Sequence, residues 1–517
     1  MNNDQPPPPA SHGSTTGPPS PAGRATPARV YRSGVTAIAI AWSMRLIGLV
    51  SVFVLARLLT PADFGIVALA MATMALLEIF ASLGLRQALL RIREPDRSHY
   101  DTAWTLQLLL LTVLAAIAAA LGPAVAWFYS EPALAWVIVA LAARFVILGL
   151  VNIGITDFDR HLQLGRDLRM RLAVRLSAFA VTIAVALIVQ SYWALVIGAL
   201  VQSAFHAIAS YVAHPFRPRF SIERRGDLLG MSLWMFVANA AQTVQVEIER
   251  FVVGRLGSIS VVGFYSVSKD LSSIFTQEIA TALNRVTFVT TAQSGARLGA
   301  DPQRIVAMLG TYALLAAPLG LGLAATARNA ALVLLGEQWV DAVPFLELIA
   351  PAAALFAVYK LVLSSMQASG AARRAAMLAI FGLALIAGGI GATAWQGGTP
   401  LDMAASVLAA TGLLLVFALL VLARSEALPA APLVLSVARP FVAALAMTWV
   451  VTQISLPSAP PIAELALQVA LGALTFFAAN TALWFAARRP PGAERIAAQW
   501  IAERAATARS RARRGNG

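Results

Sequence analysis

The chain has 517 residues, of which 59% are hydrophobic and 12% are charged, and its formal net charge is +14. A soluble globular protein carries about 25% charged residues, so this composition excludes an ordinary soluble enzyme and indicates a polytopic membrane protein. Cysteine is absent, which excludes disulfides, thiolate nucleophiles and cysteine-ligated metal sites.

The two ends of the chain differ from its middle. Residues 1–29 are rich in Pro, Ser, Thr and Gly and contain no apolar run. This composition predicts a disordered tail and neither a packed domain nor a secretory signal. Residues 488–517 are rich in arginine, and they are expected to form a second, basic tail.

Fourteen continuous apolar segments lie between these tails. Each is near or above the roughly 20 residues that a helix needs to cross a bilayer. The sequence therefore predicts an all-α polytopic membrane protein with about 14 transmembrane helices. The expected segments are 34–56, 61–84, 103–129, 132–155, 171–190, 192–213, 227–253, 260–288, 303–327, 341–367, 375–394, 402–423, 436–455 and 461–487.

Arginine is distributed unequally between alternate loops. With fourteen spans, the loops on one side carry several arginines each, whereas those on the other side hold only Arg57, Arg255 and Arg328. Basic residues favour cytoplasmic loops, so both termini are expected in the cytoplasm. This asymmetry also accounts for the positive net charge, and no nucleic-acid partner is expected.

The sequence contains an internal repeat. Residues 53–70 align with residues 251–268 without gaps, so that Phe53, Arg57 and Gly65 fall on Phe251, Arg255 and Gly263. Six spans precede the second copy, which therefore enters the membrane from the same side as the first. Repeats of this kind build two-lobed transporters around a central site.

The repeat predicts a division of the chain into lobes. We expect an N-terminal lobe of six helices over 30–213, a C-terminal lobe of six helices over 214–423, and two further helices over 424–487.

Three strings resemble one transporter family. LARLLTPADFG (55–65), GLRQALLR (84–91) and VEIERFVVGRLGSISVVGFYSVSKDL (246–271) are similar to segments of the Wzx-like oligosaccharide and polysaccharide flippases of the MOP superfamily. The resemblance covers roughly residues 30–487 and implies two lobes around a cavity that opens alternately to either side. It also implies transport of undecaprenyl-pyrophosphate-linked oligosaccharides across a bacterial inner membrane. One residue departs from the family pattern, since Glu249 stands where Asp is expected.

Two arginines lie in the middle of predicted spans. An ionisable residue at such a depth is costly and usually faces a cavity or a partner. Arg45 is interpreted as a cavity cation for a pyrophosphate, because a guanidinium matches phosphate oxygens, with a structural ion pair as the alternative. For Arg144 the two interpretations are equally supported.

The seventh predicted span carries a polar stripe. At 100° per residue its members share one arc of about 140°, and they should face water or protein, not lipid. We interpret the stripe as a cavity wall that binds sugar hydroxyls, with a hydrogen-bonded seam between helices as the alternative. The stripe consists of Asn239, Gln242, Gln245, Glu249 and Arg250.

The eighth predicted span places Lys269 near this stripe. Lys269 is expected to face either the cavity or Glu249, and a buried Lys–Glu pair could couple transport to protons or sodium. A static salt bridge is the alternative. Glu247, three residues before Arg250, is expected to pair with it, and Asp270 is assigned to helix packing.

Two alternative functions of the same fold stay open. One is an ion-coupled exporter of drugs or other small molecules, which the cations Arg45, Arg144 and Lys269 disfavour; the other is a flippase for a peptidoglycan precursor. An enzyme is not expected, because the predicted external loops are too short to hold a catalytic site. We expect no catalytic residue, cofactor or metal, a lipid-linked oligosaccharide as substrate, contact with membrane lipids, and a monomer, and we leave open other polysaccharide assembly proteins as partners.

Overall fold

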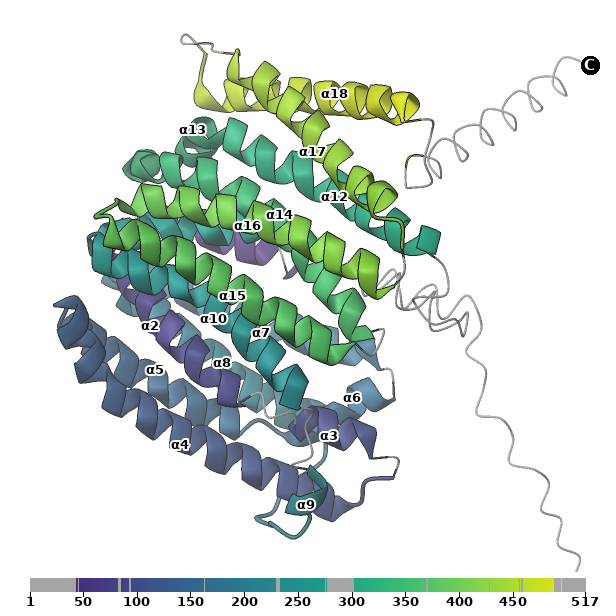
Figure 1. Ribbon diagram of the computed structural model, residues 1–517. Coiled ribbons are helices and arrows are strands. Elements are labelled where there is room, and N and C mark those ends of the chain that lie inside the picture. Colours follow the sequence, from purple (N-terminus) through teal and green to yellow (C-terminus); the bar gives the residue numbers. More distant parts are fainter. Residues whose placement is uncertain are drawn as a thin grey trace, which may run out of the picture.

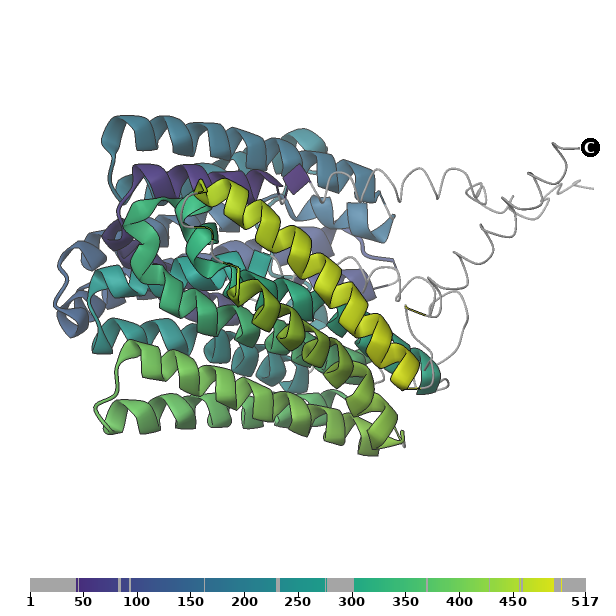
Figure 2. The ribbon, with the colours of Figure 1, turned by 90° about the horizontal axis from the view of Figure 1, so that it is seen from above.

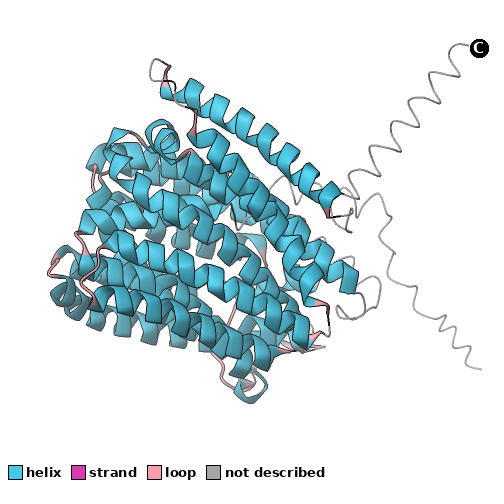
Figure 3. Ribbon diagram, turned by 45° about the horizontal axis from the view of Figure 1, so that its top comes forward, coloured by secondary structure: helices cyan, strands magenta, loops and turns pink. Residues whose placement is uncertain are grey.

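The computed structural model is a bundle of long helices (Figure 1). It describes residues 43–494 except 45, 82–84, 93, 162, 229–232, 275, 277–301, 369–370, 427, 455, 457–458 and 488–493. Within these residues the secondary structure is helical, with loops and turns between the helices (Figure 3). Arg45 and both predicted tails, apart from residue 494, lie outside the described residues.

The N-terminal half begins with the apolar helix Leu46–Leu58. It continues with α2 (Pro61–Ala81), α3 (Leu85–Arg91), α4 (Arg97–Tyr129), α5 (Ala133–Gly149), η1 (Ile153–Ile155), α6 (Thr156–Arg160), α7 (Leu164–Val189), α8 (Trp193–Ala213) and α9 (Arg225–Leu228).

The C-terminal half begins with α10 (Leu233–Leu256), which is followed by a helix over residues 259–274. The later elements are α12 (Pro302–Ala325), α13 (Ala327–Ala330), η3 (Ala331–Leu335), η4 (Glu337–Ala342), α14 (Val343–Ala368), α15 (Ala372–Trp395), α16 (Pro400–Ser425), α17 (Ala430–Thr452) and α18 (Pro461–Ala486).

The chain is a multi-pass membrane protein. Ten helices among the described residues are long and apolar enough to cross a membrane, or eleven if Ala133–Gly149 and Ile153–Arg160, bent by 67°, form one span. The helix Leu46–Leu58 is shorter, α10 carries four charged residues in its second half, and the expected segment 260–288 is described only in part. The all-α polytopic class is confirmed, and the count of fourteen stays a prediction.

The helices pack in pairs within each half and meet between the halves. In the N-terminal half α4 packs on α5 and α7 on α8, whereas in the C-terminal half α10 packs on α15 and α12 on both α14 and α17. The helices α2 and α10 join the halves, and one cluster of buried apolar side chains includes Leu69 of α2, Val253 of α10 and Tyr265. Figure 2 shows α18 lying obliquely across the outside of the bundle. The predicted lobe boundaries stay predictions.

Polar caps fix where two of the long helices begin. Asp96 precedes α4 and accepts a hydrogen bond from the backbone N–H of His99 at 3.1 Å, while Thr399 precedes α16 and bonds reciprocally with Asp402. Such capping boxes satisfy backbone N–H groups that a helix start leaves unpaired. Hydrogen bonds from Ser98 and His99 hold the pKa of the Asp96 carboxyl well below its usual range. Asp96 therefore stays charged at the start of α4, where the helix dipole favours an anion.

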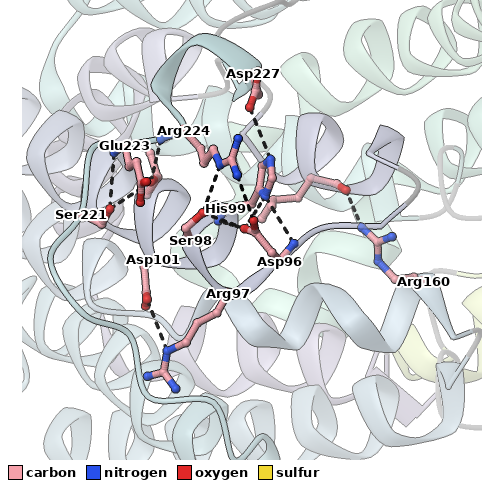
Figure 4. A network of polar contacts seen from close by, with 12 residues as sticks. Asp96, Arg97, Ser98, His99, Asp101, Arg160, Ser221, Glu223, Arg224 and Asp227 are labelled. Carbon is pink, nitrogen blue, oxygen red and sulfur yellow. Dashed lines mark hydrogen bonds and ion pairs between the residues drawn. The ribbon is translucent and has the colours of Figure 1, made fainter.

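The connection from α8 to α10 is bound to the start of α4 (Figure 4). Asp101 accepts a hydrogen bond from the backbone N–H of Arg219 at 2.7 Å, and the guanidinium of Arg224 donates to Asp96 at 3.2 Å. His99 lies between Asp96 and Asp227, with its Nε2 3.4 Å from the Asp227 carboxylate. Residues 219–227 of this connection therefore lie along the start of α4.

His214 anchors the beginning of this connection. Its Nδ1 accepts a hydrogen bond from the backbone N–H of Phe216 at 3.2 Å, and its Nε2 lies 3.4 Å from a carboxylate oxygen of Asp157. Nδ1 can accept only when it carries no proton. Burial lowers the pKa of His214, and the neighbouring Asp157 carboxylate opposes this shift.

We expect acid to weaken the fold through His214. Because its folded-state pKa is lowered, its contribution to stability is complete above the ordinary histidine pKa of about 6.5 and is lost as the pH falls below it. The melting temperature of the wild type should therefore fall more between about pH 7.5 and about pH 5.5 than that of His214→Asn. In this variant the amide oxygen replaces Nδ1 as the hydrogen-bond acceptor. Thermal unfolding in detergent measures the difference, and equal losses in both proteins would contradict the assignment.

Candidate functional site

The charged residues of α10 and of the helix over 259–274 form one network. These two helices are consecutive, and they lie side by side because a short turn reverses the chain between them. The end of α10 contributes Glu247, Glu249 and Arg250, and the second helix contributes Lys269 and Asp270. Three carboxylates thus face two cations, which leaves a formal charge of −1.

Glu249 is the buried centre of one half of the network. One carboxylate oxygen accepts hydrogen bonds from the Lys269 ammonium at 2.5 Å and from the Tyr265 hydroxyl at 2.6 Å. The Lys269 ammonium also donates to the backbone carbonyl of Val246 at 2.5 Å. The side chains of Glu249 and Lys269 are 9% and 17% exposed. Of the two orientations predicted for Lys269, the structure therefore has the one toward Glu249.

Arg250 is the centre of the other half. Its guanidinium donates to Glu247 at 2.7 Å and to Asp270 at 2.9 Å. The predicted pairing of Glu247 with Arg250 is confirmed. Asp270 was assigned to helix packing, and its carboxylate, which is 57% exposed, joins the second helix to α10. The Nε of Arg250 is buried without a partner among the residues that the structure describes.

Ion pairing offsets the cost of placing the charges of this network within membrane spans. A single charge in the middle of a span costs roughly 2.5–3.5 kcal/mol on insertion scales, and pairing with hydrogen bonds offsets this cost. Glu249 and Arg250 are adjacent on α10, so they point about 100° apart and need separate partners. Tyr265 and Lys269 share one face of the second helix because they are four residues apart.

The polar stripe of α10 does not form one continuous open wall. Asn239 is exposed, and Gln242 is half-buried and donates to the backbone carbonyl of Ala238 at 3.3 Å. Gln245 is 1% exposed and its amide has no hydrogen-bond partner within the described part of the chain. Its Nε2 lies close to Gly382 of α15, which leaves room for it by lacking a Cβ. Their assignment to a substrate cavity stays a prediction.

Of the two arginines that were predicted to face a cavity, the structure describes only Arg144. Arg45 lies outside the described residues. Arg144 of α5 forms an ion pair with Glu78 of α2 at 2.5 Å, and the two side chains are 26% and 41% exposed. The structure thus has the ion pair that was one of the two interpretations of Arg144.

The role of Tyr265 and the partner of Asp270 were not predicted from the sequence. The spacing of Tyr265 four residues before Lys269 could have indicated the shared face, since residues i and i+4 are neighbours on a helix. The partner of Asp270 could not be read from sequence, because it depends on the rotation of α10. The described residues contain no group of three or more His, Asp or Glu that could hold a metal ion.

Comparison with known proteins assigns the family. The model of a family described as "Polysaccharide biosynthesis protein" matches residues 54–344, which is more than half of the chain. The chain belongs to this family. The matched range contains both copies of the repeat except Phe53, and all the residues of the charge network.

Curated relatives carry related names. The chain is 28% identical over 319 residues to the succinoglycan biosynthesis transport protein ExoT of Rhizobium meliloti, which covers 58% of this chain and 61% of that protein. It is 21% identical over 315 residues to the lipopolysaccharide biosynthesis protein WzxC of Escherichia coli, covering 59% of this chain and 62% of WzxC. The matches thus span about three fifths of these relatives.

Solved structures show the fold. The lipid II flippase MurJ in an inward closed conformation matches with a TM-score of 0.69 at 11% identity, covering 88% of this chain and all of that one. A multidrug resistance MATE family transporter of the MOP superfamily, inward-facing, matches with a TM-score of 0.56 at 16% identity, covering 76% of this chain and 98% of that one. The chain therefore shares the fold of these two proteins.

We expect the Glu249–Lys269 pair to be far more sensitive to losing one member than to losing both. Lys269→Met should destabilise the protein by about 3–5 kcal/mol, because it leaves the Glu249 carboxylate buried without its cation. The double variant Lys269→Met, Glu249→Leu should recover most of this loss, since no unpaired charge remains. Denaturant or thermal unfolding in detergent measures both, and additive destabilisation would contradict the pairing.

Proposed function

We propose that the protein moves polyprenyl-pyrophosphate-linked oligosaccharide repeat units across the bacterial inner membrane, for the synthesis of lipopolysaccharide or another surface polysaccharide. It does so by alternating access and catalyses no covalent step. The observation that carries this proposal is the family match over residues 54–344. The relative ExoT, which is named a transport protein, and the two-copy repeat support it.

The substrate contacts follow from the chemistry of a lipid-linked glycan. Arg45 and Arg144 are proposed to bind the pyrophosphate, Arg144 by exchanging its bond to Glu78 for phosphate oxygens. Asn239, Gln242 and Gln245 are proposed to bind sugar hydroxyls, and the prenyl chain stays in lipid. Glu249, Arg250 and Lys269 complete the proposed substrate region.

The charge network is also the proposed coupling element. Its surplus carboxylate lies in the Arg250 half, where Glu247 and Asp270 share one guanidinium. Glu249 is balanced by Lys269, so a proton or a sodium ion taken up there competes with that ammonium. Uptake at Glu249 would weaken its bond to Lys269 and free that ammonium. We therefore propose that the Glu249–Lys269 pair switches between a bonded state and a state in which the bond is broken.

The orientation follows from the arginine asymmetry of the loops. Loops rich in arginine favour the cytoplasm, so we place the end of the bundle that carries α3, α6 and α9 on the cytoplasmic side, with both termini. The substrate then enters from the cytoplasmic leaflet and leaves at the opposite end.

A deletion strain tests the proposed activity. Loss of the gene should abolish the surface polymer and cause lipid-linked repeat units to accumulate on the cytoplasmic face, and the wild type should reverse both effects. Arg45→Ala should fail to restore the polymer, because the pyrophosphate loses its cation. Polymer composition and the sidedness of the lipid-linked units are the measurements.

The paired variants separate stability from transport. The double variant Lys269→Met, Glu249→Leu is expected to fold but not to restore the polymer; full restoration would make the network purely structural. Unchanged polysaccharide in the deletion strain, with altered sensitivity to toxic cations, would contradict the flippase and support a drug exporter.

A further inference from the structure

The two copies of the repeat touch each other through a pair of glycines. A Cβ added at Gly65 would lie 1.9 Å from the backbone oxygen of Ile259, and a Cβ added at Gly263 would lie 1.9 Å from the backbone oxygen of Pro61. Gly263 follows Gly65 by 198 residues, and Ile259 follows Pro61 by the same 198. The contact is therefore reciprocal, because each glycine packs against the backbone carbonyl of the residue four positions before the other glycine.

These contacts leave no space for any other residue. Real Cβ atoms essentially never come within 3.0 Å of such a neighbour, and a backbone carbonyl cannot rotate away as a long side chain can. Alanine favours a helix more than glycine does. The two glycines thus make their helices less favourable, but they allow the two backbones to approach closely.

Hydrogen bonds near the glycines also run between the two halves. Trp339, from the C-terminal half, donates its indole N–H to the carbonyl of Ala56 at 2.8 Å. Tyr129, from the N-terminal half, donates its hydroxyl to the carbonyl of Phe251 at 3.0 Å. Each half therefore places an aromatic donor on the first helix of the other half.

Further contacts seal the same end of the bundle. The Trp339 ring packs edge-on against Phe64 at 5.2 Å between centroids and against Phe264 at 5.9 Å. Arg57 donates to the carbonyl of Val333 at 2.6 Å. The glycine contact itself joins equivalent residues of the two copies, so it is self-complementary, as in a two-fold symmetric dimer.

We propose that Gly65 and Gly263 are the contact points through which the two repeats close this end of the transporter. The inference rests on alternating access, the proposed function, because only then must the contact form and separate in each cycle. A side chain at either position holds the copies apart and shifts the protein toward the state open at this end. The symmetry requires the two glycines to have similar effects.

A cysteine reporter tests the closure without a substrate. The natural chain contains no cysteine, so Ala56→Cys, at a position that is 0% exposed, introduces a single thiol at the closed end. Its reaction with a hydrophilic maleimide is compared in the Ala56→Cys protein and in the same protein with Gly65→Ala or Gly263→Ala. Reaction should be about tenfold faster or more in both variants, which corresponds to a shift of about 1.4 kcal/mol.

Matched controls separate closure from unfolding. Gly391→Ala also replaces a helical glycine, but nothing lies within 4 Å of its added Cβ, so it should leave the labelling rate unchanged. A reporter at Ala118→Cys, 0% exposed within the N-terminal half, should stay unreactive in every folded variant. Unchanged labelling of Ala56→Cys in both glycine variants would overturn the proposal, whether or not the protein transports lipid-linked glycans.

A tether covers the case in which the alanine variants do not fold. Gln338 donates to the carbonyl of Ala56 at 2.5 Å, so the cysteine pair Ala56→Cys, Gln338→Cys can be joined by a short reversible thiol cross-linker while both glycines remain. Cross-linking should stop polymer export and reduction should restore it. Continued export by the cross-linked protein would overturn the proposal.

Discussion

The buried bond between Glu249 and Lys269 is the interaction on which the centre of this protein depends. Both charges lie on helices that also form the contact between the two repeats, and neither is tolerable alone in a membrane span. Tyr265 and the carbonyl of Val246 complete the bonding of this pair. The pair therefore holds the helix over 259–274 against α10. The contacts of this helix with the N-terminal half depend on that position.

The same helix connects the charge network to the reciprocal glycine contact. Gly263 precedes Lys269 by six residues, which is about 9 Å along a helix. A rotation or shift of the helix that accompanies loss of the Glu249–Lys269 bond would move Gly263 away from the carbonyl of Pro61. The proposed ion-coupling element and the proposed closing contact are thus two ends of one rigid element, which is the kind of link that alternating access requires.

The opposite end of the bundle is organised by polar groups of another kind. There the connection between the halves lies on α4 and is held by backbone bonds to Asp101 and by the charged cluster of Asp96, His99 and Arg224 (Figure 4). Water-exposed ion pairs contribute little each, so the backbone bond from Arg219 to the buried Asp101 contributes most to the path of this connection.

The sequence by itself determined the membrane class, the repeat and the pairing of Glu247 with Arg250. Apolar segments of sufficient length can only be helices in a bilayer, and the i, i+3 spacing of Glu247 and Arg250 is local. Tertiary structure decided the rest: the bond of Asp270 to Arg250, the burial of Gln245 against Gly382, and the meeting of Gly65 with Ile259. These depend on how each helix is rotated and on which helix lies beside it. Local spacing carries neither quantity, because a helix presents the same sequence whichever neighbour it faces.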